Sequence, residues 1–374
     1  MRPGAAARLP VSLWVLLALM LIAFALGTLR NGTAAGVEFR ADFYFMAGLL
    51  YFSSFEWTRE RVGRLLAWLF AVVLSVMLVV WFRWVMDAFG LDWVEPVWRY
   101  MDITGVSLRV INAEQTWILG LAVVLLVYAM AAGNSLARLR FTLPLLALTV
   151  LVLQHRSVWV ASFLPALMAF FIVRQSQGKL AQRMLVIAGL TAMVLGPMLA
   201  MGKFSTATTS VADLAVRATS TTEGTFVART QGWNALLHQW AASGPRGWLM
   251  GEPYGVGFKR MEGDREVAYA PHNYYIQVLL RLGIIGLLAF IAFNIYVFRG
   301  AIRLAGGPYD NMTGYTMLGI LTSFALFNIP YSPAYTQGLF IGIILALVLQ
   351  HQAKSAAVAG RSDAQGAVRV VGAS

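Results

Sequence analysis

The sequence predicts an all-α polytopic membrane protein with about ten transmembrane helices and one large loop outside the membrane. Of its 374 residues, 59% are hydrophobic and 12% are charged, whereas a soluble domain has about 25% charged residues. The apolar residues form runs of roughly 18–25, the length that crosses a bilayer as a helix. One long polar stretch interrupts these runs. We therefore divide the chain into residues 1–201 with seven spans, a large loop 202–272 outside the membrane, residues 273–352 with three spans, and a tail 353–374.

The first apolar run follows Arg2 and Arg8 and imitates a signal peptide. Its apolar core is too long for one and no clean cleavage site follows, so we interpret it as the first span. The tail is rich in Ala, Gly, Ser and Arg, and we expect it to be disordered. The ten predicted spans cover residues 9–29, 37–55, 65–86, 114–133, 139–154, 157–173, 184–201, 273–298, 312–330 and 335–351.

The connections between these spans alternate between a strongly basic and a weakly basic side. The positive-inside rule places the basic side, which includes both termini, in the cytoplasm, so the 202–272 loop faces outward. We therefore attribute the net charge of +12 to membrane topology and to contact with anionic lipids. Nucleic-acid binding is not expected, since the sequence contains no basic stripe with interleaved aromatic residues. The absence of cysteine excludes disulfides, thiolate nucleophiles and thiolate metal sites.

Arg229 is the first candidate site residue. It lies on a predicted helix over residues 226–240, and Trp233, Leu236 and Trp240 fall within roughly 40° of it on a helical projection. The arginine therefore shares the apolar face, where it either reaches the lipid headgroups along Trp233 or binds an anion such as a phosphate. His238 points the opposite way and is expected to be solvated.

Arg156 is the second candidate, at the outer end between two apolar helices. It is either an interfacial anchor or an anion ligand, because a charge near the bilayer requires a partner or the interface. The neighbouring His155 is interpreted as structural.

His272 begins the helix that follows the large loop. A histidine there is commonly an interface or capping residue, but the positive end of the helix dipole favours the neutral imidazole and attracts a phosphate. We therefore identify His272 as a candidate general base. Arg281 lies nine residues further and about 13 Å deeper, on a different face, and is a secondary candidate. The glycines Gly283 and Gly286 indicate close helix packing.

The glycine run from Gly251 to Gly257 has no strand before it and no βαβ unit around it, so it indicates a tight turn rather than a nucleotide loop. The acidic residues of the outer loop lack metal-ligand spacing. We expect neither a metal nor a cofactor.

These residues together resemble the family of O-antigen ligases and O-antigen polymerases. The resemblance covers mainly residues 150–290 and is carried by Arg156-Ser157, Arg229 with Trp233, the glycine run, Pro271-His272-Asn273 and Leu282-Gly283-Ile284-Ile285-Gly286-Leu287. It implies a GT-C-like glycosyltransferase of the bacterial inner membrane that uses a glycan on undecaprenyl diphosphate at the periplasmic face. His272 would deprotonate the acceptor hydroxyl, and Arg229 and Arg156 would hold the diphosphate. The family often has an acidic residue before the Leu-Gly pair, whereas this chain has Arg281. The difference implies either an altered contact with the substrate or an extra ligand for the diphosphate.

Several functions stay open. A polymerase joins lipid-linked repeat units of O-antigen or exopolysaccharide, with other polysaccharide-assembly proteins as possible partners. A ligase moves the glycan to lipid A core, and a third relation transfers it to protein. A flippase of lipid-linked sugar would also use arginines for the diphosphate, but it needs charges along both halves of the protein, and an envelope scaffold would need no indispensable polar residue. The sequence contains almost nothing that separates polymerase from ligase; we take the polymerase as the first expectation and the ligase as its alternative.

Overall fold

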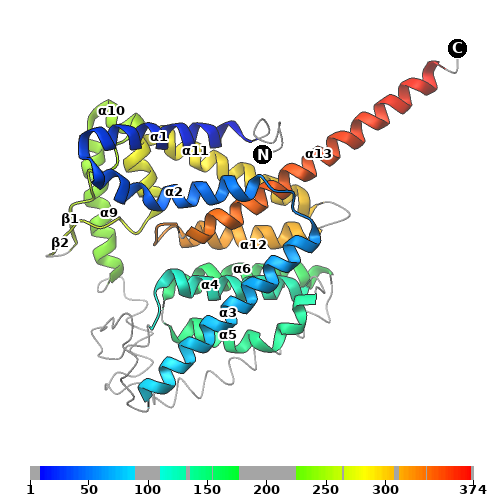
Figure 1. The fold of residues 1–374 in the computed structure, drawn as a ribbon, viewed down its shortest axis with the longest axis horizontal. Coiled ribbons are helices and arrows are strands. Elements are labelled where there is room, and N and C mark those ends of the chain that lie inside the picture. The colour runs from blue at the N-terminus through cyan, green and yellow to red at the C-terminus, as the bar shows by residue number, and fades with distance from the viewer. Residues whose placement is uncertain are drawn as a thin grey trace.

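The computed structural model describes residues 9–88, 110–131, 135–153, 155–176, 225–262, 265–306, 311–333 and 335–371. The chain there is predominantly helical, as predicted (Figure 1). Its elements are α1 (Val11–Asn31), α2 (Thr33–Ser53), α3 (Arg59–Ala88), α4 (Ala113–Ala131), the 3-10 helix η2 (Ser135–Thr142), α5 (Leu143–Val152), α6 (Arg156–Ser176), α9 (Thr225–Ala242), α10 (Gly244–Met250), β1 (Arg260–Glu262), β2 (Arg265–Val267), α11 (Tyr274–Ala305), α12 (Asn311–Phe327) and α13 (Tyr335–Val371).

Within these ranges, five helices are long and apolar enough to cross a membrane: α1, most of α3, α4, α11 and the first part of α13. Shorter apolar helices lie in α6 and α12. The helix α2 covers the predicted span 37–55, but it carries Glu38, Arg40 and Asp42 and is not among the five. The predicted span 184–201 lies outside the described residues, so the count of ten stays a prediction.

The predicted span 139–154 is corrected by the structure. It consists of η2 followed by the ten-residue helix α5. Pro144 lies in the first turn of α5. Proline is tolerated at the start of a helix, but inside a helix it removes a backbone hydrogen bond. A single helix through this position is therefore disfavoured.

Two further expectations differ from the structure. The strands β1 and β2 form an antiparallel hairpin in which Arg260 pairs with Val267, so the predicted loop 202–272 is not entirely without strands. Residues 353–371, expected to be disordered, continue α13, which projects from the body of the molecule (Figure 1). The alanines of this segment explain the difference, since alanine has the highest intrinsic helix propensity.

The described helices before and after the stretch 202–272 share one apolar core. α13 packs along α2, α1 along α11, and α4 against α6 and α12. Gly338 and Gly342 of α13 approach the carbonyls of Phe45 and Leu49 on α2, where any side chain would overlap the neighbouring backbone. Small residues at such crossings let helix backbones approach closely.

The α1–α2 turn, α9, α10, the hairpin and the start of α11 gather at one end of this body, at the left in Figure 1. Gly283 breaks α11 there with a φ of +64°. A side chain at Gly283 would overlap the Leu249 carbonyl, and one at Gly251 would overlap the backbone of Arg281. The N–H of Glu252 donates to the Leu280 carbonyl at 2.8 Å. The expectation of close packing at Gly283 is confirmed, and its partner is the end of α10.

Candidate active site

Helix α9 brings Arg229 and Trp233 to the start of α11. The predicted helix over 226–240 is confirmed. The indole N–H of Trp233 donates to the Pro271 carbonyl at 2.6 Å, directly before the candidate histidine. Leu236 is buried and His238 is exposed, as the helical projection predicted. The apolar face of α9 therefore fixes this helix to the protein, with Arg229 near its first turn.

His272 lies one residue before the cap of α11 rather than in the helix itself. The side chain of Asn273 caps the helix, and α11 begins at Tyr274. His272 has a φ of +46°, in the left-handed region that few residues other than glycine adopt. Its N–H donates to the Ala270 carbonyl at 2.9 Å, and its ring centroid lies 5.1 Å from that of Tyr269.

The first amides of α11 are partly used by protein acceptors. The N–H of Tyr274 donates to the Asn328 carbonyl at 2.9 Å, and the N–H of Ile276 donates to the Asn273 side chain at 3.1 Å. The helix start was expected to attract a phosphate through such groups. With two of these amides occupied, the predicted anion binding at this position would depend more on neighbouring side chains, of which Arg229 is one.

Tyr331, in the segment after α12, brings the two candidates together. The Arg229 guanidinium carbon lies 5.3 Å from the centroid of the Tyr331 ring, within the range of a cation–π contact. The His272 ring lies 6.1 Å from the same ring, nearly perpendicular to it. Arg229 also donates to the Pro330 carbonyl at 3.4 Å, and Phe327 stacks on Tyr331 at 4.8 Å. We call Arg229, His272 and Tyr331 the Tyr331 cluster.

Arg156 begins α6, and its side chain lies outside the described part of the structure. The preceding His155 contacts the Ile111 carbonyl through Nε2 at 3.1 Å, in line with its structural interpretation. Trp117, one turn into α4, lies 5.0 Å from the ring of Phe327 at the end of α12. The start of α6 therefore belongs to the same end of the helical body as the Tyr331 cluster.

Arg281 is placed apart from that cluster. Only 3% of its side chain is exposed, and it forms an ion pair with Glu38 of α2. Its Nη2 donates to the Gly257 carbonyl at 2.6 Å, and its guanidinium lies 4.1 Å from the ring of Phe258. The predicted difference in face from His272 agrees with these contacts. Contact between Arg281 and a diphosphate stays a prediction.

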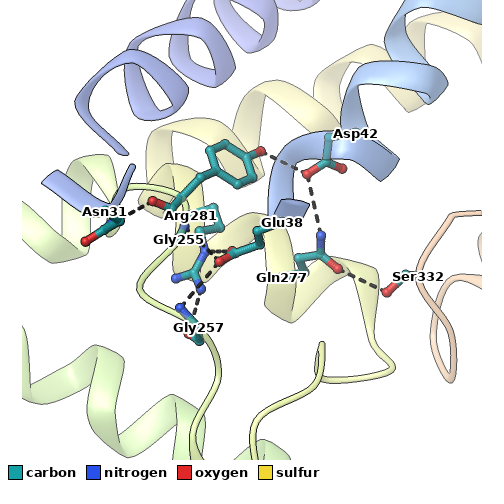
Figure 2. Close-up of polar contacts among 9 residues, drawn as sticks. Asn31, Glu38, Asp42, Gly255, Gly257, Gln277, Arg281 and Ser332 are labelled. Carbon is teal, nitrogen blue, oxygen red and sulfur yellow. Dashed lines mark hydrogen bonds and ion pairs between the residues drawn. The ribbon is translucent and has the colours of Figure 1, made fainter. Parts of the chain in front are cut away.

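The glycine run forms the predicted tight turn, and Glu38 holds it. Gly251, Gly255 and Gly257 all have positive φ angles, which only glycine adopts readily. The second carboxylate oxygen of Glu38 accepts from the amides of Gly255 at 2.9 Å and Gly257 at 3.4 Å. One buried carboxylate thus joins α2, this turn and Arg281, as Figure 2 shows.

Asp42, one turn after Glu38, is the centre of a second buried set of hydrogen bonds. Its carboxylate accepts from the hydroxyls of Tyr254 at 2.9 Å and Tyr274 at 3.0 Å and from the amide of Gln277 at 3.5 Å. Burial raises the pKa of the Tyr254 hydroxyl well above its usual range, so it stays a donor. Gln277 accepts in turn from Ser332 at 3.0 Å (Figure 2). The network therefore reaches the residue next to Tyr331.

The sequence analysis missed Glu38, Asp42 and Tyr331. Two acids spaced by four residues inside a predicted span were a usable signal, because ionisable residues in such segments are costly and generally paired. Nothing in the sequence marked Tyr331. No three His, Asp or Glu side chains of the described residues come together as a metal site would need, and the expected independence from metal stays a prediction.

A family model described as O-antigen ligase matches residues 141–291. This stretch contains Arg156, Arg229, the glycine run, His272 and Arg281, and it leaves Glu38, Asp42 and Tyr331 outside. The resemblance stated from the motifs is therefore confirmed. No curated protein matches the chain.

Proposed function

We propose that the protein is a glycosyltransferase of the bacterial inner membrane, because residues 141–291 match a family model described as O-antigen ligase. It transfers a glycan from undecaprenyl diphosphate to an acceptor hydroxyl at the periplasmic face, with neither nucleotide nor metal. Its product is a polymer of O-antigen or exopolysaccharide repeat units.

One observation carries this proposal: Arg229 and His272 lie against the same aromatic ring, that of Tyr331. They come from separate elements, α9 and the segment before α11, and Trp233 ties these elements together through the Pro271 carbonyl. A permanent cation and an imidazole are thereby held in one half-buried place. Transfer from a diphosphate-linked sugar donor needs this combination, because catalysis requires proton removal from the acceptor and stabilisation of the charge on the leaving diphosphate in a fixed geometry.

The roles follow from the chemistry of the two groups. His272 accepts the proton of the acceptor hydroxyl as its oxygen forms the new bond to the anomeric carbon. The bond between that carbon and the diphosphate oxygen breaks, and undecaprenyl diphosphate leaves with the electron pair. Arg229, together with Arg156, neutralises the developing negative charge through paired hydrogen bonds to phosphate oxygens. The diphosphate is already a good leaving group, so atoms and charge balance without a further reactant.

The backbone of His272 supports a functional role. Residues held at unfavourable φ cost about 1–3 kcal/mol and cluster at active sites. Here the turn to Ala270, the Asn273 cap and the Trp233 contact together hold this conformation. The strain is explained if the imidazole must point to one fixed place.

A second candidate is an O-antigen ligase that transfers the glycan to lipid A core. The description of the matching family model favours it. The acceptor distinguishes the two, since a polymerase leaves long glycan on undecaprenyl diphosphate and a ligase leaves glycan on lipid A core.

The experiment compares wild type with His272→Asn and Arg229→Gln in membranes at matched expression. Asparagine tolerates positive φ, so His272→Asn removes the base without adding backbone strain. The matched controls are His238→Asn on the exposed face of α9 and Arg303→Gln in the last turn of α11. Glycan length and its lipid carrier are measured.

We expect the two site variants to lose product at least about 100-fold, the scale of general-base and charge-stabilisation effects, with lipid-linked precursor accumulating outside and both controls unaffected. Normal product from His272→Asn contradicts the catalytic role. Precursor trapped on the cytoplasmic side indicates a flippase instead.

A further inference from the structure

A second candidate site lies between α1 and α10, apart from the residues of the Tyr331 cluster. A cavity of about 150 Å³ opens there, lined by one face of α1 and by the segment 243–253. None of its lining residues belongs to the Tyr331 cluster or to the Glu38 and Asp42 networks. What it binds is therefore a separate question from the proposed transfer reaction.

The α1 wall of this cavity is an apolar stripe that ends in a cation. Leu19, Ile22, Ala23 and Leu26 line it, followed by Arg30. These positions follow the spacing of one helix face, and from the first to the last they extend about 16 Å along the axis at 1.5 Å per residue. Since α1 is long and apolar enough to span a membrane, the stripe runs along the bilayer and Arg30 stands at its surface.

The other wall supplies the remaining polar groups. Arg246 of α10 lines the cavity together with Ser243 and Glu252. Neither Arg30 nor Arg246 makes a hydrogen bond or ion pair with any residue in the described ranges, and both are exposed. Two arginines and one glutamate leave a net charge of +1 around the opening.

Helix α10 has the composition of a segment at the membrane surface. Trp248, Leu249 and Met250 follow Arg246 and are exposed large apolar side chains. Tryptophan and arginine beside exposed apolar residues are typical of the headgroup level of a bilayer. The two arginines of the cavity thus lie where lipid phosphates are found.

We propose that this cavity binds a membrane phospholipid with one net negative charge, of which phosphatidylglycerol is the simplest. One acyl chain lies along the α1 stripe, and the phosphate lies between Arg30 and Arg246. A guanidinium binds phosphate oxygens through paired hydrogen bonds. The glycerol hydroxyls of the headgroup donate to Glu252, and the single negative charge matches the net charge of the opening.

The test measures lipid binding by native mass spectrometry of the full-length protein in detergent. The probes are phosphatidylglycerol and phosphatidylcholine with identical acyl chains. We expect phosphatidylglycerol to bind preferentially, and the double variant Arg30→Gln/Arg246→Gln to lose about twenty-five-fold in affinity, about fivefold for each arginine. The matched control, Arg40→Gln/Arg303→Gln, removes two other exposed arginines and should change nothing.

A further variant distinguishes lipid binding inside the cavity from attraction of the lipid by surface charge alone. Leu26→Trp fills the half-buried apolar part of the cavity without altering the charge, and we expect it to reduce phosphatidylglycerol binding. Equal binding of both lipids, equal loss in the control pair, or full binding by Leu26→Trp overturns the proposal. Displacement of phosphatidylglycerol by undecaprenyl phosphate also overturns it, because the cavity would then serve the donor lipid.

Discussion

Glu38 of α2 and Arg281 of α11, 243 residues apart in the chain, form a buried ion pair. The same carboxylate binds two amides of the glycine turn, and the same guanidinium binds its Gly257 carbonyl. An ion pair inside a protein stabilises it only if its remaining hydrogen-bonding groups are satisfied. Here the turn satisfies them, so the pair and the turn depend on each other.

Removing one partner of this pair is expected to destabilise the protein by about 3–5 kcal/mol, because it leaves an uncompensated buried charge. Glu38→Gln and Arg281→Met test this by thermal unfolding in detergent. The double variant should lose less than the sum of the two. The exposed pair of Glu60 and Arg64 is the control, and Glu60→Gln should change stability by less than about 1 kcal/mol. Equal effects at both pairs would contradict the structural role.

Asp42→Leu is expected to destabilise the protein more than Asp42→Asn. Leucine leaves the hydroxyls of Tyr254 and Tyr274 and the amide of Gln277 without their acceptor, and a buried donor left without a partner costs about 1–3 kcal/mol. Asparagine keeps one acceptor oxygen. Denaturation midpoints of wild type and the two variants provide the measurement, and midpoints of both variants equal to that of wild type would show that the network contributes nothing.

Gly251→Ala is expected to be more harmful than Gly32→Ala. Both glycines have positive φ, so both substitutions cost about 1 kcal/mol or more in backbone strain. Only at Gly251 does the new side chain also overlap the backbone of Arg281, whereas Gly32 has open space around it. The yield of folded protein and its unfolding temperature report the difference. If the two variants behave alike, α10 does not pack on α11 as described.

Tyr331→Phe should retain activity, while Tyr331→Leu should reduce kcat/KM by roughly threefold to thirtyfold. The reason is that phenylalanine keeps the aromatic face for Arg229, and a cation–π contact contributes about 0.5–2 kcal/mol. Turnover of lipid-linked glycan in vesicles measures both variants. A large loss in Tyr331→Phe would assign a role to the hydroxyl instead.

Ser332→Ala tests whether the Asp42 network positions Tyr331. It removes the hydrogen bond to Gln277, worth about 0.5–1.5 kcal/mol, without touching the Tyr331 cluster itself. We expect a small loss of stability and a reduced kcat with little change in KM. An unchanged kcat would limit the network to a structural role.

The sequence by itself determined the helical class, the helix that carries Arg229, the tight turn at the glycines and the close packing at Gly283. Each of these depends on local periodicity, on φ preferences or on side-chain size, which neighbouring residues suffice to define. The resemblance to O-antigen ligases and polymerases also came from the sequence, because motif order and spacing are properties of the chain, and a family model matches residues 141–291. The separate placement of Arg281 and His272 followed from helix geometry alone.

Only the tertiary structure decided which residues meet. Arg229, His272 and Tyr331 come from three segments, and no local pattern states that the segment after α12 contacts both α9 and the residues before α11. Glu38 and Asp42 were visible as acids in an apolar helix, but their partners lie more than 200 residues away. The predicted span 139–154 is broken because of Pro144, and the helix continues after residue 353 because alanine favours helices. A prediction based on average hydrophobicity does not include either preference. Local chemistry fixes elements, whereas contacts across the core depend on how all of the elements pack.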